Sequence, residues 1–150
     1  MANAWFRFKQ FTVHQQYAAM KVTTDACLFG ALLPVYEPSD GIRMLDIGTG
    51  TGLLSLMAAQ KNPGSQIIGV EIDQAAAEEA TQNIAGSLFR ENISVVQGNV
   101  LNYTPKESFH HIFSNPPFYE NQLTSPAKGK NLAHHSSALT LVDIMAYIKL

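Results

Sequence analysis

The chain has 150 residues, of which 46% are hydrophobic, so it is long enough for one globular domain around a single core. Its formal net charge is −2, which excludes a global basic field for nucleic acid and leaves only a local contact. No apolar run approaches a membrane span and the N-terminus lacks a signal-peptide core, so we expect a cytoplasmic protein.

Residues 1–13 alternate apolar and polar side chains, which predicts a short strand or hairpin. Any local nucleic-acid contact would involve cations there and further along, although scattered surface cations more often have no such role. The candidates are Arg7, Lys9, Lys21, Lys128 and Lys130.

Residues 24–33 are predicted to form a helix, with Asp25 near its start. The single cysteine, Cys27, lies in an apolar run of this helix, which indicates a reduced core residue and agrees with a cytoplasmic setting. Prolines and Gly41 then indicate a loop, and we place an N-terminal cap region at 1–40 and a βαβ core at 41–150.

The core begins with an apolar strand, residues 44–47, that leads into a turn with glycines at alternate positions, Gly48, Gly50 and Gly52. Such glycines let the backbone bend sharply and let a ligand approach without meeting a Cβ atom. Residues 53–60 then form a predicted helix, whose first N–H groups have no partner within the helix.

A second strand ends at Glu71, about twenty residues further on, where an acidic side chain can accept the ribose hydroxyls of a nucleoside. A helix over 73–84 follows, with Asp73 as N-cap and Gly86 as stop. Strands are predicted over 93–97 and 110–114, and another helix from 141 to 150. This alternation predicts an α/β protein with a doubly wound, mostly parallel sheet.

The glycine spacing bears on the ligand. Dinucleotide folds prefer G-x-G-x-x-G, whereas this turn is G-x-G-x-G and has no Arg or Lys nearby for phosphate. A nucleoside without phosphates fits better, and a nucleotide-binding module or NAD-type dehydrogenase stays open as an alternative.

Asn115-Pro116-Pro117-Phe118 follows the fourth strand as a stiff corner. The prolines exclude helix and central strand, and Asn115 is held extended because it precedes a proline. The corner presents an amide, free carbonyls and an aromatic face, which suit a flat, amine-bearing group. An ordinary rigid turn is the simpler interpretation of these four residues alone.

Taken together, the motifs resemble those of the class I S-adenosylmethionine-dependent methyltransferases, whose first motif is similar to residues 46–52. The resemblance implies that S-adenosyl-L-methionine is the cofactor and that the Rossmann-like sheet has the strand order 3-2-1-4, as the N-terminal portion of a longer domain. It also implies cofactor contacts by Asp46, the three glycines, Glu71 at the ribose, Ile72 on the adenine, Asn99 at the adenine amine, and Asn115.

The Asn-Pro-Pro-Phe corner resembles the catalytic motif of amino-methyltransferases, in which Asn115 and Pro116 would bind the target amine and Phe118 would stack on the base. Residues 8–11 and 20–31 resemble the N-terminal region of the bacterial tRNA-valine adenine-N6 methyltransferases, which implies that Lys21, Thr24 and Asp25 help to hold the cofactor. A tRNA partner follows from this resemblance; a ribosomal RNA guanine-N2 or protein glutamine methyltransferase is the alternative.

The five histidines include two adjacent pairs, His110-His111 and His134-His135, and neither has metal-ligand spacing. We therefore expect no metal, and we expect a monomer.

Overall fold

The computed structural model describes residues 3–37, 41–116 and 139–148. The chain divides into two compact units, Met1–Pro116 and Pro117–Leu150. The N-terminal segment thus belongs to the same unit as the sheet.

In its described residues, the first unit contains a two-stranded hairpin, three α-helices and a four-stranded sheet. In chain order its elements are β1 (Trp5–Arg7), β2 (Thr12–His14), α1 (Thr24–Leu32), β3 (Arg43–Ile47), α2 (Leu53–Lys61), β4 (Gln66–Glu71), α3 (Gln74–Ala85), β5 (Ile93–Gln97), the 3₁₀ turn η2 (Val100–Asn102) and β6 (His111–Ser114). The predicted helices and strands are confirmed, with ends that differ by one or two residues.

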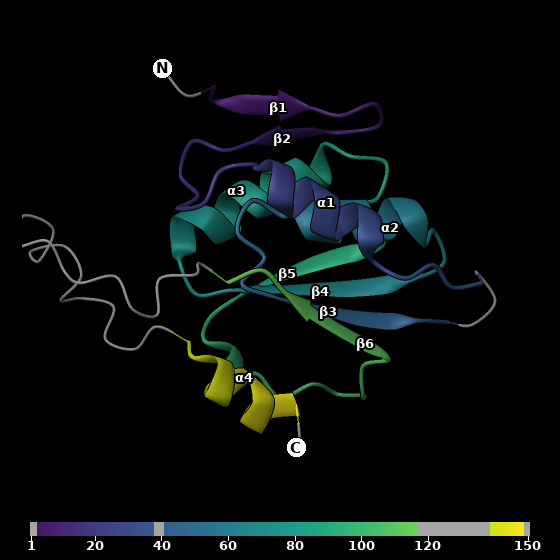
Figure 1. The fold of residues 1–150 in the computed structure, drawn as a ribbon, viewed down its shortest axis with the longest axis vertical. Helices are drawn as coiled ribbons and strands as arrows, with labels where there is room; N and C mark the ends of the chain where they lie inside the picture. The colour runs from purple at the N-terminus through teal and green to yellow at the C-terminus, as the bar shows by residue number, and fades with distance from the viewer. Residues whose placement is uncertain (1–2, 38–40, 117–138, 149–150) are drawn as a thin grey trace, which may run out of the picture. The chain divides into compact units, whose positions relative to one another are not determined.

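The four strands of the sheet are parallel and lie in the order β5-β4-β3-β6 (Figure 1). Counted from β3, the first strand of this sheet, that is the order third, second, first, fourth; the separate hairpin adds two to the strand numbers. The α/β class with a parallel, Rossmann-like sheet is confirmed.

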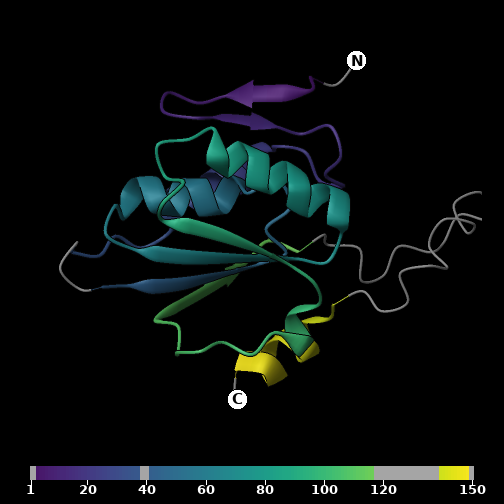
Figure 2. The same cartoon turned by 180° about the vertical axis from the view of Figure 1, so that it is seen from behind.

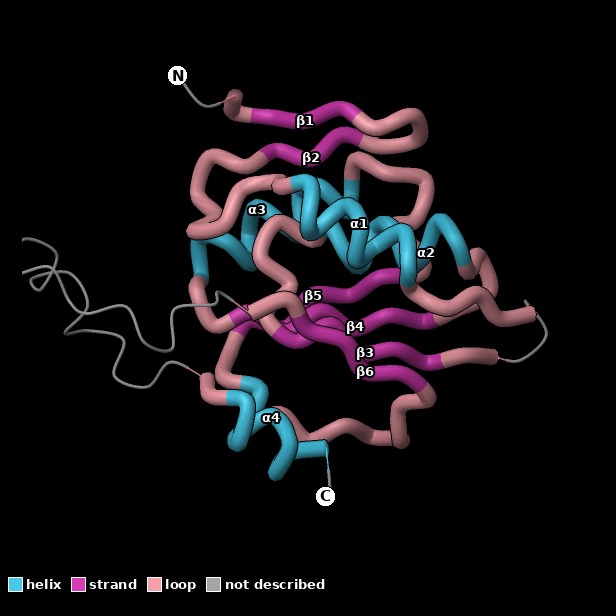
Figure 3. Tube along the Cα trace, in the orientation of Figure 1, coloured by secondary structure: helices cyan, strands magenta, loops and turns pink. Residues whose placement is uncertain are grey.

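The helices α1, α2 and α3 lie on one face of the sheet, as both views show (Figures 1 and 2). Met44, Ile67 and Ile93 are in register across three strands and are buried in the core that these helices cover. A Cβ atom on Gly30 of α1 would lie only 2.3 Å from the Met57 sulfur of α2, so this glycine allows the two helices to pack closely. The hairpin lies on the outer side of the helices (Figure 3).

Local capping explains where the helices begin. Asp73 accepts a hydrogen bond from the Ala76 N–H at 2.8 Å and caps α3, and Gly86 ends that helix, both as predicted. Helix α1 is capped by the side chain of Thr23.

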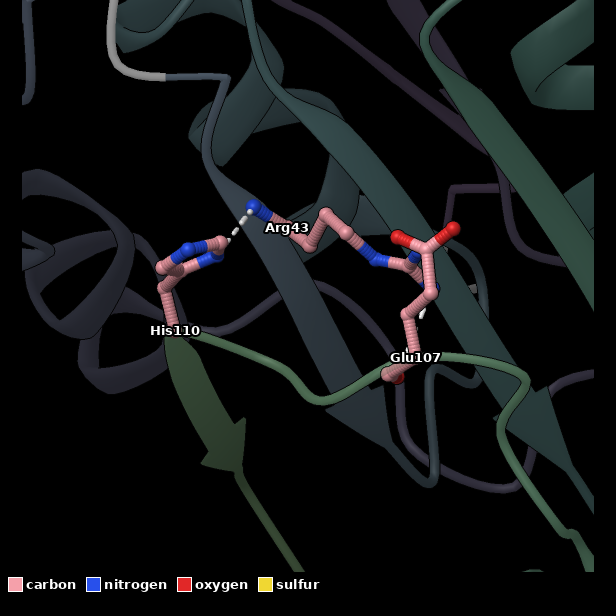
Figure 4. A network of polar contacts seen from close by, with 3 residues as sticks. All are labelled: Arg43, Glu107 and His110. Atoms are coloured by element: carbon pink, nitrogen blue, oxygen red, sulfur yellow. Dashed lines mark hydrogen bonds and ion pairs between the residues drawn. The ribbon is translucent and has the colours of Figure 1, made fainter.

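The position of β6 beside β3 is fixed at the start of both strands. The Arg43 N–H donates to His110 Nδ1 at 3.0 Å, and the Arg43 guanidinium forms an ion pair with Glu107 (Figure 4). Because β6 precedes Asn115, this register also decides where the proline corner begins.

The second unit contains α4 (Leu141–Ile148). Its first turn is a capping box, since the Thr140 N–H donates to the Asp143 carboxylate and the Asp143 N–H donates to Thr140 Oγ1. The Thr140 hydroxyl also donates to this carboxylate, and this bond, together with the one from the Thr140 N–H, lowers the pKa of Asp143 below its usual value. Across the described ranges, we find no helix with both the length and the apolar character needed to span a bilayer.

Candidate functional site

The glycine turn between β3 and α2 lies at the carboxyl ends of the strands. Gly48, Gly50 and Gly52 have φ values of 71°, 56° and 81°, a region that glycine adopts at little cost. The Gly48 and Thr49 N–H groups both donate to the Val70 carbonyl, which ties the turn to β4. The predicted sharp bend is therefore present.

The three glycines do different things. A Cβ atom on Gly48 would meet nothing within 4 Å, and one on Gly50 would meet only the Gly48 carbonyl oxygen at 4.0 Å. A Cβ atom on Gly52 would instead lie 3.5 Å from Ala80 and Ile84 of α3. The first two positions leave room for a ligand against the backbone, whereas Gly52 allows close helix packing.

Glu71 ends β4 beside this turn. Its Oε2 accepts a hydrogen bond from the Gly50 N–H at 2.8 Å, and its Oε1 accepts one from the Asp73 N–H at 3.0 Å. A carboxylate has about four acceptor sites, so two remain for other donors such as ribose hydroxyls. Glu71 thus supports the turn and retains the capacity to bind a ligand.

Asp46 is fully buried next to the turn. Its Oδ2 accepts hydrogen bonds from Thr49 Oγ1 and Ser55 Oγ, each at 2.7 Å. Burial raises the pKa of Asp46 to about 6, with the nearby Glu71 charge adding to the rise and the hydroxyl bonds opposing it. The structure therefore shows Asp46 holding the turn and α2 together, and its predicted contact with the cofactor stays a prediction.

Ile72 and Asn99 lie at the neighbouring strand ends. The Gly98 N–H donates to the Glu71 carbonyl at 2.8 Å, and Gln97 Nε2 donates to the Ile72 carbonyl, so the two loops are side by side. The Ile72 side chain is 54% exposed and available to a flat ligand. Asn99 Oδ1 already accepts a hydrogen bond from the Leu101 N–H, and its second lone pair remains available to another donor.

The Asn115 corner leaves the sheet at the same edge. Ser114 pairs with Ile47 in the parallel register, and Ser114 Oγ donates to the Ile47 carbonyl at 2.8 Å. The residues that follow, Asn115 and Gly48, therefore emerge from adjacent strands. Asn115 and Pro116 are half-buried, while Pro117 and Phe118 lie outside the described residues.

Lys21, Thr24 and Asp25 are exposed on the segment that leads into α1. That segment is fixed by Gln15, whose Oε1 accepts from the Val22 N–H and whose Nε2 donates to the Asn3 carbonyl. Direct contact of the three residues with a cofactor stays a prediction.

Two buried polar residues of α3 were missed in the sequence. Glu79 accepts hydrogen bonds from three successive N–H groups, those of residues 16–18. Asn83 bonds both backbone groups of His14 and also donates to the Thr51 carbonyl at 2.9 Å. Polar residues on the buried stripe of α3, among Ala76, Ala80 and Ile84, could have revealed them.

The described residues fit a nucleoside that carries no phosphate. Open space lies over Gly48, a carboxylate with spare acceptor sites stands beside it, and an exposed apolar side chain follows. The residue that precedes α2, Gly52, makes no side-chain cap hydrogen bond to the N–H groups of the first turn. Such a site can hold a nucleoside ligand next to the Asn115 amide, whose oxygen can accept a hydrogen bond from an amine.

Comparison with known proteins gives consistent results. A profile described as methyltransferase small domain matches residues 18–141. The chain is 45% identical over 147 residues to a tRNA1(Val) (adenine(37)-N6)-methyltransferase of Dyadobacter fermentans, covering 98% of this chain and 60% of the relative. It is also 45% identical to a protein of the same name from Bacteroides thetaiotaomicron, covering 97% and 60%. The chain thus spans about 60% of the length of these curated relatives.

Among solved structures, a methyltransferase of Thiobacillus denitrificans in complex with S-adenosyl-L-homocysteine matches with a TM-score of 0.51. Its sequence is 22% identical, and the match covers 61% of this chain and 36% of that one. This similarity supports the fold.

Proposed function

The chain belongs to the methyltransferase small domain family, and from that premise we propose that it methylates the exocyclic N6 of an adenosine in tRNA, next to the anticodon of tRNA-Val, using S-adenosylmethionine. The names of the relatives that are 45% identical support the substrate. The observation that carries the chemistry is that the glycine turn, with Glu71, and Asn115 leave the sheet at one edge. A cytoplasmic monomer with tRNA as its partner completes the proposal.

The cofactor-binding residues have separate tasks in this proposal. When bound, S-adenosylmethionine supplies an electrophilic methyl group on a positively charged sulfur. Glu71 accepts the ribose hydroxyls, Ile72 packs against the adenine and the Asn99 oxygen accepts from the adenine amine. Gly48 and Gly50 keep the backbone open to the ligand.

Asn115 and Pro116 prepare the target amine. An exocyclic nitrogen donates its lone pair into the ring and is a poor nucleophile. If the Asn115 amide oxygen and the Pro116 carbonyl accept its two N–H bonds, they favour a pyramidal nitrogen whose lone pair points at the methyl group. Phe118 would stack on the extruded base. The methylated amine loses its proton readily, so no strong base is needed.

The test is incubation of the protein with S-adenosylmethionine and unmodified tRNA-Val, followed by nucleoside analysis. We expect N6-methyladenosine, and Asn115→Ala should abolish its formation while leaving cofactor affinity nearly unchanged. Absence of N6-methyladenosine, with methylation of ribosomal RNA guanine or of a protein glutamine instead, would favour the alternative methyltransferases.

Thermal protection separates these enzymes from the other class. S-adenosylmethionine should raise the melting temperature, because a ligand that binds only the folded state stabilises it. If NAD or ATP protects the protein and S-adenosylmethionine does not, the methyltransferase proposal is wrong.

A further inference from the structure

The N-terminal hairpin has an inner and an outer face. Phe6 pairs with Val13, which is completely buried in the core, so these two residues belong to the inner face. Side chains alternate along a strand, and the pairs on either side are Trp5 with His14 and Arg7 with Thr12. Trp5, Arg7, Thr12 and His14 therefore share the outer face, here called the hairpin platform.

An aromatic ring and a cation are both accessible on this platform. Trp5 is 53% exposed, and Arg7, His14 and the adjacent Lys9 are exposed as well. The neighbouring aromatic residues pack on one another: Phe8 stacks on Phe11 with a centroid separation of 4.7 Å, Phe6 is tilted against Phe8 at 4.9 Å, and Phe11 is buried in the core. Phe6 is 44% exposed as well, but its ring packs against Phe8 on the inner face, whereas Trp5 lies on the outer face of the hairpin.

The charge around the platform differs in sign from that of the whole chain. Residues 1–24 contain three of the 10 Lys and Arg residues and none of the 12 Asp and Glu residues, although the net charge is −2. Glu79, a carboxylate that contacts this segment, is buried and accepts hydrogen bonds from three of its backbone N–H groups. The platform thus complements a polyanion, although the chain as a whole is net negative.

The platform is held in a fixed relation to the glycine turn. Asn83 accepts from the His14 N–H at 2.8 Å, donates to the His14 carbonyl at 2.9 Å and donates to the Thr51 carbonyl at 2.9 Å. One side chain therefore joins the end of β2 to the turn that is proposed to hold the cofactor.

We propose that the hairpin platform binds unpaired nucleotides of the RNA substrate, with Trp5 stacking on a base and Arg7 and Lys9 contacting phosphates. Bases within a duplex are already stacked on one another, so an exposed indole can stack only on nucleotides that are unpaired or splayed out. A second copy of this chain fits less well, because an isologous contact would bring the same cations face to face. The inference rests on the proposed function, since it assigns that enzyme's RNA-binding surface.

Trp5 is the only tryptophan of the chain, so its fluorescence reports on the platform directly. Titration with unmodified tRNA-Val should quench this fluorescence to saturation, and an unstructured RNA oligonucleotide should also quench it. Trp5→Ala should weaken RNA binding about tenfold or more, as expected for loss of one base stack, and leave affinity for S-adenosylhomocysteine unchanged. Leu88→Ala, which removes an apolar side chain that is 80% exposed elsewhere, is the matched control and should change neither affinity.

The outcomes distinguish this inference from the proposed function. Methylation of tRNA without fluorescence quenching, and with normal RNA affinity in Trp5→Ala, would overturn the platform and leave the enzyme activity standing. Saturable quenching by RNA without methylation of tRNA would support the platform and refute the proposed reaction. Self-association that depends on Trp5 and occurs without RNA would show that a second copy covers this face, and would overturn the inference.

Discussion

Asp46 shows how a single buried carboxylate can organise a ligand-binding turn. It accepts from two hydroxyl groups, one in the turn and one on α2, and its side chain is only 1% exposed. Its ordinary pKa of 3.8 is raised to about 6 because burial disfavours the charged form. The stability of the turn is therefore linked to pH.

We predict that the stability contribution of Asp46 falls as pH rises. Because the pKa is higher in the folded state, folding takes up a proton between pH about 4 and about 6, so the free energy of unfolding declines across that interval. The decline should amount to roughly 2–3 kcal/mol relative to Asp46→Asn, which stays neutral. Urea unfolding of both proteins between pH 4 and pH 7 measures the difference; parallel curves would contradict the pKa shift.

Glu71 has two tasks, and its replacement should affect both. Glu71→Ala removes the acceptor for the Gly50 and Asp73 N–H groups and also the proposed ribose contact. We expect cofactor binding to weaken by about 1–3 kcal/mol, as for a lost charged hydrogen bond. Calorimetry with S-adenosylhomocysteine measures this, and melting of the ligand-free protein separates the loss of turn stability. An unchanged dissociation constant would reject the ribose contact.

At the scale of elements, α3 joins the hairpin to the glycine turn and the sheet. Its buried stripe alternates small apolar residues, which pack against the glycine turn and β5, with Glu79 and Asn83, which bind the backbone of the N-terminal segment. The hairpin has few strand residues of its own, and a two-stranded hairpin alone is marginally stable in water. Hydrogen bonds from α3 therefore keep it in place.

We predict that Glu79→Gln lowers the free energy of unfolding by about 2–3 kcal/mol. The amide supplies one acceptor oxygen where the carboxylate supplies two, so at least one N–H among residues 16–18 loses a charged partner. Glu78→Gln is the matched control, since Glu78 is exposed and accepts a hydrogen bond from the nearby Gln74 side chain, and it should change stability by less than about 0.5 kcal/mol. Chemical denaturation gives both values. Equal effects of the two substitutions would show that Glu79 does not anchor the segment.

At the scale of the whole molecule, the uneven charge distribution determines where a polyanion can bind. The chain is net negative, so RNA should be attracted only to local groups of cations such as that of the N-terminal segment. Each phosphate contact releases counterions and adds about 0.7–0.9 to the slope of log affinity against log salt concentration. The slope therefore counts the contacts.

We predict that replacing both Arg7 and Lys9 by Ala reduces this slope for tRNA-Val by about 1.4–1.8, as expected for two lost phosphate contacts. Replacing both Arg90 and Lys106, exposed cations outside the N-terminal segment, leaves the net charge the same as in the first variant and should leave the slope unchanged. Fluorescence anisotropy at several salt concentrations gives the slopes. Equal reductions in both variants would mean that RNA responds to net charge and not to the hairpin.

Much of the fold could be predicted from local sequence patterns. The glycine turn after an apolar strand, the Asp73 cap and the Gly86 stop each depend on residues close together in the chain, and all are confirmed. Strand order followed from the family resemblance, and parallel pairing brought Glu71 and Asn115 to one edge, as expected. The predicted corner can be compared with the structure only as far as Pro116, because Pro117 and Phe118 lie outside the described residues.

The sequence alone thus determined the elements, their class and the residues worth considering for the site, because backbone sterics, capping and periodicity act between near neighbours. Only the tertiary structure decided that Asp46 is buried and accepts hydrogen bonds from two hydroxyl groups. It also decided that Gly52 packs against α3 while Gly48 remains open, and that Asn83 joins His14 to Thr51. These relations connect segments that are up to 69 residues apart. Packing selects such contacts, and no local pattern specifies them.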